Sequence, residues 1–124
     1  MDYKEKIASL NKKKYPVDVP DWEMKVYMRK LSVREFKEVF KVDDKELGEI
    51  LEMLEGTDEE KQKAKELLKI QDDQISENVI ACCYDENDER MFQDSDLKDI
   101  ANNYCTLSTS KILTKHFLCL NNMN

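Results

Sequence analysis

The stretch that most constrains the fold is residues 17–40, which pass from a strand pattern to a helix pattern without a spacer. Apolar and polar side chains alternate over residues 22–29, which predicts a strand with one apolar and one mostly charged face. Ser32 and Glu35 then form an S-x-x-E capping box, a signature of a helix N-terminus. We therefore expect a strand that leads directly into a capped helix.

This strand is expected to be the second half of an N-terminal β-hairpin. Residues 15–19 are predicted to form the first strand, with the turn inside residues 18–23. A two-stranded hairpin alone is marginal in water, so its apolar face must pack on helices or on a partner. Leu31 and Phe36 stand at the positions of a hydrophobic staple around the capping box. The apolar face is expected to carry Trp22, Met24, Val26 and Met28.

Apolar residues at three- and four-residue spacing predict two short helices next. The first follows Ser32 and ends near Lys41. Asp43 and Glu46 form a second capping box, and Gly56 is expected to end the helix that they begin. The expected inner residues are Val33, Phe36, Val39 and Phe40 in the first helix, and Leu47, Ile50, Leu51 and Leu54 in the second.

A longer helical region is predicted to follow. Thr57 and Glu60 form a third capping box, and the pattern reaches Cys82 with a bend or break near Asp72 and Asp73. Its inner face is expected to hold Ala64, Leu67, Leu68, Gln71, Ile75, Val79 and Cys82.

Two further helices are predicted after an acidic turn at residues 84–90. Asp94 or Ser95 is expected to cap the first and Ser108 the second. Their inner faces would carry Leu97, Ile100, Ala101 and Tyr104, and then Ile112, Leu113, Phe117 and Leu120.

The fold class is therefore predicted to be mainly α with a short N-terminal β-hairpin, a small α+β fold with about five helices around one core. Residues 1–14 are polar and lysine-rich, and we expect a flexible arm or a short helix there. Residues 15–122 are expected to form one globular domain, with the hairpin at 15–30 and the helical part at 32–120.

Charge and composition narrow the classes of partner. The chain has 124 residues, 38% of them charged, and a formal net charge of -7. Its basic residues are scattered, so we do not expect a nucleic-acid partner. No stretch approaches the roughly 18 apolar residues of a membrane-spanning helix, and the N-terminus lacks the apolar segment of a signal peptide. We therefore expect no membrane partner and a cytoplasmic location.

The acidic turn resembles a calcium-binding loop only in part. Arg90 stands where an EF-hand needs glycine for its sharp turn. The residues at EF-hand ligand positions are Asp85, Asn87, Glu89 and Asp96. A solvated turn is the favoured interpretation, and we expect neither a metal nor a cofactor.

No pattern identifies a catalytic site. His116 lies one turn from Cys119, but no nearby carboxylate would orient a Cys-His pair, and a partly buried structural histidine is favoured. The chain is not expected to be an enzyme. The cysteines match no zinc, redox or disulfide spacing and are expected to be small core residues: Cys82, Cys83, Cys105 and Cys119.

Two segments carry short motifs whose order and spacing resemble a known family. Residues 17–42 contain V-D-V-P-D-W, V-Y-M-R-K-L-S and R-E-F, and residues 80–92 read I-A-C-C-Y-D-E-N-D-E-R-M-F. These resemble V-x-V-P-E-W, V-Y-V-R-x-L-T and E-R, and then a helix ending in a cysteine-containing turn with D-x-D-G-x-x-x-F, in the tail assembly chaperones of long-tailed bacteriophages. Residues 93–97 and 118–122 are similar to the F-T-x-x-D-h and closing L-x-L-N-G segments of that family.

The chain departs from the family pattern at three places. Asp88 stands where the turn usually has glycine, and Asn122 replaces the terminal glycine. Met28 replaces a β-branched strand residue. The replacement of glycine at positions 88 and 122 affects the backbone conformations that these two turns can adopt.

The resemblance implies a non-catalytic role in tail morphogenesis. Such proteins bind the tape-measure protein, keep it soluble, help to recruit tail-tube proteins, and are absent from the mature virion. It also implies the bacterial host cytoplasm as location, and self-association or a longer frameshifted form as further possibilities. The motif positions and candidate partner contacts are Val19, Pro20, Trp22, Val26, Tyr27, Arg29, Leu31, Phe36, Asp85, Phe92 and Asp96.

Two alternatives stay open. Trp22 and Tyr27 could form an exposed patch for a partner, or Trp22 could anchor the hairpin on the helices. The net charge also fits an acidic helical modulator that occupies a basic host surface, as a nucleic-acid mimic does.

Overall fold

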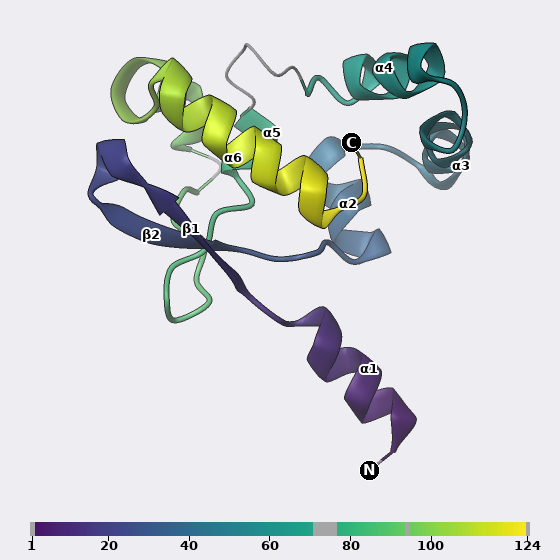
Figure 1. The fold of residues 1–124 in the computed structure, drawn as a ribbon, viewed down its shortest axis with the longest axis horizontal. Coiled ribbons are helices and arrows are strands. Elements are labelled where there is room, and N and C mark those ends of the chain that lie inside the picture. Colours follow the sequence, from purple (N-terminus) through teal and green to yellow (C-terminus); the bar gives the residue numbers. More distant parts are fainter. Residues whose placement is uncertain (1, 71–76, 94, 124) are drawn as a thin grey trace.

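The computed structural model describes residues 2–70, 77–93 and 95–123, and it has a small α+β fold (Figure 1). Strands β1 (Tyr15–Val19) and β2 (Met24–Met28) form the hairpin, joined by the 3-10 turn η1 (Pro20–Trp22). The other elements are α1 (Tyr3–Asn11), α2 (Val33–Phe40), α3 (Asp44–Leu54), α4 (Asp58–Leu67), α5 (Glu77–Ile80), the 3-10 turn η2 (Leu97–Asp99), the π-helical turn η3 (Ile100–Tyr104) and α6 (Leu107–Leu120). The predicted fold class is confirmed.

The hairpin has the predicted buried face. β1 and β2 pair antiparallel, and four side chains on this face are at most 1% exposed: Val17, Val19, Val26 and Met28. Trp22 does not belong to the strand, because the chain turns at η1 and Glu23 has a positive φ of 52°. Met24 lies at the uncovered end of β2 and is 46% exposed, so its predicted burial is wrong.

All three predicted capping boxes are present. The Ser32 side chain accepts a hydrogen bond from the Glu35 N–H at 3.1 Å, and Glu35 Oε1 accepts one from the Ser32 N–H at 3.2 Å. The same reciprocal pair of bonds begins α3 and α4. These bonds satisfy N–H groups that have no partner inside the helix, so the local sequence fixes where each helix begins.

Three side chains predicted to lie inside these helices are exposed instead. Val33 is 65% exposed, Leu51 is 53% exposed and Leu67 is 56% exposed. Val33 and Leu67 are the terminal residues of α2 and α4, and Leu51 borders the stripe that Leu47 and Ile50 bury on α3. The buried stripes are therefore narrower and shorter than the apolar patterns.

The helix ends agree only in part with expectation. α3 ends at Leu54 with Glu55 as its C-cap, so the predicted end before Gly56 is confirmed, although Gly56 has no positive φ and is not a left-handed cap. α4 stops at Leu67, and Lys69 turns the chain with a φ of 58°, so no single helix continues through this point. The expected break near Asp72 and Asp73 lies outside the described residues, as do the inner positions Gln71 and Ile75.

The segment before α6 is predicted to be an α-helix, but its described residues form η2 and η3. The Cys105 N–H bonds to the Ile100 carbonyl at 3.0 Å, the longer spacing of a π-helical turn. Tyr104, predicted to lie inside, is 43% exposed. Thr106, and not Ser108, caps α6, while the alternative cap Asp94 lies outside the described residues.

The core forms where α6 lies across the hairpin and beside α5 (Figure 1). Leu113, Phe117 and Leu118 are the large apolar side chains that α6 buries there. The ring of Phe117 lies 5.8 Å from that of Phe40, which ties α2 to α6. α6 thus joins the two segments that carry the sequence motifs.

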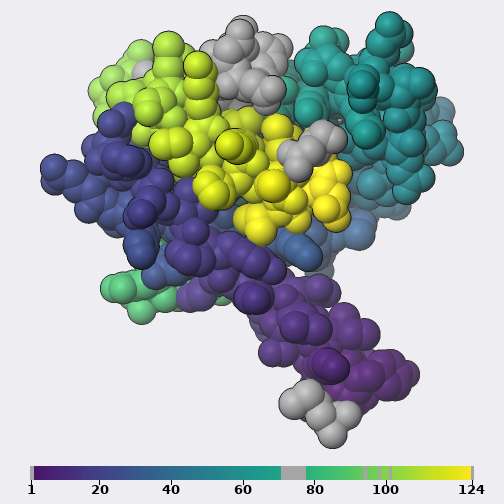
Figure 2. All heavy atoms as spheres, in the orientation of Figure 1, coloured from purple at the N-terminus to yellow at the C-terminus, as the bar shows by residue number. Residues whose placement is uncertain are grey.

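α1 lies apart from this core. It buries none of its residues and projects from the body as the purple extension in Figures 1 and 2. The short helix expected within residues 1–14 is therefore present, whereas the flexibility of this arm and the limits of the single domain stay predictions.

Candidate interaction site between the hairpin and the acidic turn

The two motif segments meet at the free edge of β2. The Tyr27 N–H donates to the Tyr84 carbonyl at 2.9 Å, and the Tyr84 N–H donates to the Tyr27 carbonyl at 2.8 Å. Lys14 adds a bond from its Nζ to the Glu86 carbonyl at 2.9 Å, and it lies over the Tyr27 ring at 5.5 Å from the centroid. The hairpin and the acidic turn (residues 84–90) are thereby held together.

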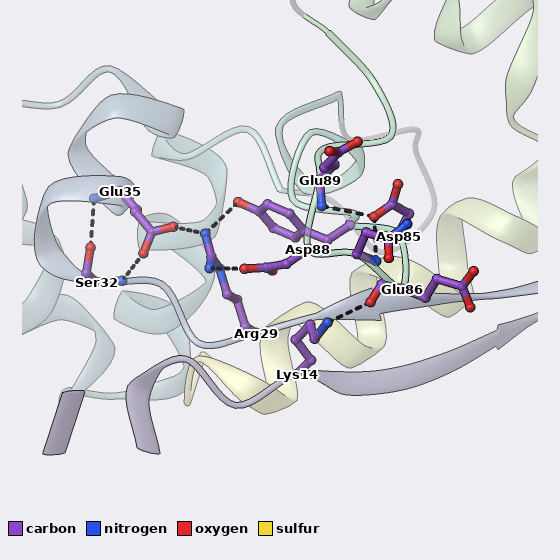
Figure 3. A network of polar contacts seen from close by, with 10 residues as sticks. Lys14, Arg29, Ser32, Glu35, Asp85, Glu86, Asp88 and Glu89 are labelled. Atoms are coloured by element: carbon purple, nitrogen blue, oxygen red, sulfur yellow. Dashed lines mark hydrogen bonds and ion pairs between the residues drawn. The ribbon is translucent and has the colours of Figure 1, made fainter. Parts of the chain in front are cut away.

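Arg29 occupies the junction of the hairpin, α2 and the acidic turn (Figure 3). Its Nη2 donates to Glu35 Oε2 at 2.9 Å and to the Tyr84 hydroxyl at 3.2 Å, and its Nη1 lies 3.5 Å from Asp88 Oδ2. The guanidinium also lies over the Tyr84 ring, 4.4 Å from the centroid. We call these four residues the Arg29 cluster.

The cluster favours the charged guanidinium despite partial burial. Only 18% of the Arg29 side chain is exposed. Burial lowers the pKa of Arg29, but the hydrogen bond with Tyr84 and the charges of Glu35 and Asp88 outweigh it, so the pKa is raised. Glu35 holds Arg29 with one oxygen and caps α2 with the other. The helix start and the cluster are therefore one network.

The acidic turn is closed by hydrogen bonds of the Asp85 side chain and backbone. Asp85 Oδ1 accepts hydrogen bonds from the N–H groups of Asn87 and Glu89 at 2.8 and 3.0 Å, and the Asp85 N–H donates to the Glu89 carbonyl at 2.8 Å. Within this turn the backbone of Asp88 is left-handed, with a positive φ of 64°. Within the described residues, no group of three or more side chains is placed to hold a metal ion.

A second contact fixes the tip of the hairpin to the start of α6. The Trp22 indole N–H donates to the Tyr104 carbonyl at 2.6 Å, and the Phe92 ring lies between the two aromatic rings, 5.6 Å from Trp22 and 5.5 Å from Tyr104. Asp21 accepts hydrogen bonds from the hydroxyls of Thr106 and Thr109. These contacts support the anchor interpretation of Trp22, and its contact with a partner stays a prediction.

The motif positions divide by burial. Three are core residues, namely Val19, Val26 and Phe92. Those that are half-buried are Trp22, Tyr27, Arg29, Leu31, Phe36, Asp85 and Asp96, and Pro20 is exposed. Only the half-buried and exposed side chains present surface to a partner in this conformation.

The structure brings some of these positions together and keeps others apart. Tyr27, Arg29 and Asp85 belong to the junction at the acidic turn. Leu31 lies between β2 and α2, and its N–H donates to Asn121 Oδ1 at 2.9 Å. Asp96 accepts a hydrogen bond from the Gln93 N–H at 2.8 Å, which closes a local turn away from the cluster.

The motif positions omit several residues of the network. The sequence predicts a helix-capping role for Glu35 but no contact with Arg29. Tyr84 and Asp88 lie in the acidic turn, which the sequence predicts to be exposed to solvent. Lys14 belongs to a run of lysines that the sequence predicts to be part of the polar N-terminal arm. The one local signal was Asp88, a non-glycine residue at a glycine position of the motif.

The structure buries two of the four cysteine side chains and exposes the single histidine. Burial raises the pKa of Cys82 to about 12 and raises the pKa of Cys83 further, so both thiols are protonated at neutral pH. His116 and Cys119 are exposed, so the predicted partial burial of the histidine and core position of Cys119 are wrong. The reason is that α6 packs through Leu113 and Phe117, on another side of the helix.

Comparisons of the chain with protein-family models, with curated proteins and with solved structures give no match. Among the described residues, no helix combines the length and apolar character that crossing a membrane requires.

Proposed function

We propose that this protein is a tail assembly chaperone of a long-tailed bacteriophage or prophage. It binds the tape-measure protein in the host cytoplasm, keeps it soluble and helps to recruit tail-tube subunits. It acts without catalysis and is absent from the mature virion.

The observation that carries this proposal is the backbone at the two missing glycines. Asp88 and Asn122 replace glycines of the family motifs, and they have positive φ values of 64° and 54°. Glycine adopts this conformation freely, and Asp and Asn are among the few other residues that tolerate it. Five described non-glycine residues have positive φ, and the two motif positions are among them, which supports the alignment of the motifs with this chain.

The meeting of the two motif segments supports the proposal further. Tyr27 and Arg29 from the first segment contact Tyr84 and Asp88 from the second. The two segments that carry the motifs, although distant in sequence, thus lie together in the fold.

The surface also suits a protein that holds apolar helices. Met24, Val33 and Leu107 are 46%, 65% and 61% exposed, on a chain whose net charge is -7. Each of these exposed side chains is apolar area that a helical partner can bury, and the charge keeps the complex soluble.

Co-expression with the cognate tape-measure protein tests the proposal. We expect the tape-measure protein to move from the insoluble to the soluble fraction when the full chain is present. A Val26→Asp variant is the control, because a carboxylate in the core unfolds the chain and is expected to remove the effect. The proposal is wrong if the tape-measure protein stays as insoluble with the intact chain as it is alone.

A further inference from the structure

α1 presents an apolar stripe that nothing in the described structure covers. Tyr3, Ile7 and Leu10 are 69%, 54% and 60% exposed. At roughly 100° per residue they share one side of the helix, with Lys4 and Lys6 along its two borders. A nine-residue helix is marginal in water by itself, so this stripe is suited to packing on another surface.

The net positive charge of residues 1–14 favours an acidic binding surface. Residues 1–14 contain five lysines and two carboxylates, which leaves the arm positive in a chain with a net charge of -7. Glu5 lies on the side of α1 opposite the apolar stripe, so the borders of the stripe are basic. The complementary surface is therefore apolar with an acidic border.

α3 has such a surface around Gly48. Leu51 is 53% exposed one turn away, and Glu52 and Glu55 lie beside it on the same side of the helix. Residues 44–67 contain nine carboxylates and four lysines, so this part of the chain is acidic. We call the side formed by Gly48, Leu51, Glu52 and Glu55 the Gly48 face.

Neither the backbone conformation nor close packing within the described structure requires a glycine at position 48. Gly48 lies within a helix and has no positive φ, and apart from its chain neighbours and the nearby backbone of α3 no described atom lies within 4 Å of the place that a Cβ would take. A glycine inside a helix costs stability relative to alanine. The missing side chain does, however, let another helix come close to the backbone of α3, because the distance between packed helices depends on the side chains at the contact.

We propose that α1 of one copy of this chain packs along the Gly48 face of α3 in a second copy. The stripe of α1 covers Leu51 and Gly48, and Lys4 and Lys6 lie beside Glu52 and Glu55. Within one copy, α1 projects away from the body and α3 lies beyond α2, so the contact forms between copies (Figure 1). The inference does not depend on the proposed function.

The two surfaces lie at different places on the molecule, so the contact is heterologous. Each copy in a chain of contacts offers a free α1 at one end and a free Gly48 face at the other, and such contacts build rings or open filaments. Three apolar side chains make a small interface, so we expect dissociation constants on the order of 100 µM.

Sedimentation velocity of the full chain, from about 10 µM to about 1 mM, measures this association. We expect the mean mass to rise with concentration and the rise to weaken in high salt. Gly48→Gln fills the space for the partner helix and favours the α3 helix, so it is expected to raise the dissociation constant at least tenfold without loss of fold. A Glu49→Lys variant is the matched control, because Glu49 lies on another side of α3 and is exposed.

Charge reversal identifies the partner surface. Lys4→Glu with Lys6→Glu, and separately Glu52→Lys with Glu55→Lys, are each expected to remove self-association, and mixing the two variants is expected to restore it. A chain that stays monomeric to the highest concentration, or an association that survives Gly48→Gln, overturns the proposal. Failure of the mixed variants to associate overturns it as well, and so does association with anionic vesicles in place of self-association.

Discussion

Replacing Arg29 with methionine is expected to lower the free energy of unfolding by about 2–3 kcal/mol. The bond from Arg29 to Glu35 at 2.9 Å is the largest part, because a hydrogen bond between charged groups contributes roughly 1.5–3 kcal/mol. The contact with the Tyr84 ring adds about 0.5–1 kcal/mol. The pair with Asp88 is long at 3.5 Å and 42% exposed on the aspartate side, so it adds at most about 0.5 kcal/mol. Water reaches Glu35, which is 33% exposed, and limits the cost of leaving it unpaired.

Urea unfolding followed by circular dichroism measures this change, and Arg34→Met is the matched control. Arg34 pairs with Glu38 on the same helix at 3.3 Å, but the two side chains are 89% and 67% exposed, so its loss is expected to cost less than about 0.5 kcal/mol. A double-mutant cycle of Arg29→Met and Glu35→Gln is expected to give a coupling energy of about 1–2 kcal/mol. If Arg29→Met costs no more than Arg34→Met, the cluster does not join the motif segments as described.

Three further predictions test neighbouring contacts. Asp88→Gly is expected to change the free energy of unfolding by less than about 1 kcal/mol in a urea titration, because relief of the left-handed conformation offsets the lost ion pair; a loss above about 2 kcal/mol would refute this balance. Trp22→Phe is expected to cost about 1 kcal/mol for the hydrogen bond to Tyr104, and Trp22→Ala about 3 kcal/mol because the ring anchor also goes. A Trp22→Ala chain that keeps its stability but loses the tape-measure protein would instead make the hairpin tip a recognition element. At pH 8, iodoacetamide and mass spectrometry are expected to show labelling of Cys119 in the folded protein but of Cys82 only after unfolding, and rapid labelling of folded Cys82 would contradict its burial.

Local signals in the sequence predicted the parts of the fold that local contacts determine. The capping boxes join residues three positions apart, so Ser32 and Glu35 could be recognised without any knowledge of the core. The alternation that buries Val26 and Met28 is likewise a property of one strand. These elements fix the hairpin, the corner and the beginning of α2.

Contacts between distant residues could not be read from the same patterns. Arg29 contacts Tyr84 and Asp88, which lie 55 and 59 residues further along the chain. The Tyr104 carbonyl accepts a bond from Trp22, which lies 82 residues away, in a segment whose apolar spacing suggested an ordinary helix. Periodicity says which side of an element is apolar, but it does not say how much of that side a neighbour covers, as exposed Leu51 shows.

The proposed function is tested most sharply by the mass of a complex between this chain and the cognate tape-measure protein. The two proteins are co-expressed, purified through a tag on the tape-measure protein and analysed by size-exclusion chromatography with light scattering. We expect a soluble species of defined mass that contains both chains. A tape-measure protein that elutes as an aggregate, or elutes soluble while this chain elutes alone, would contradict it.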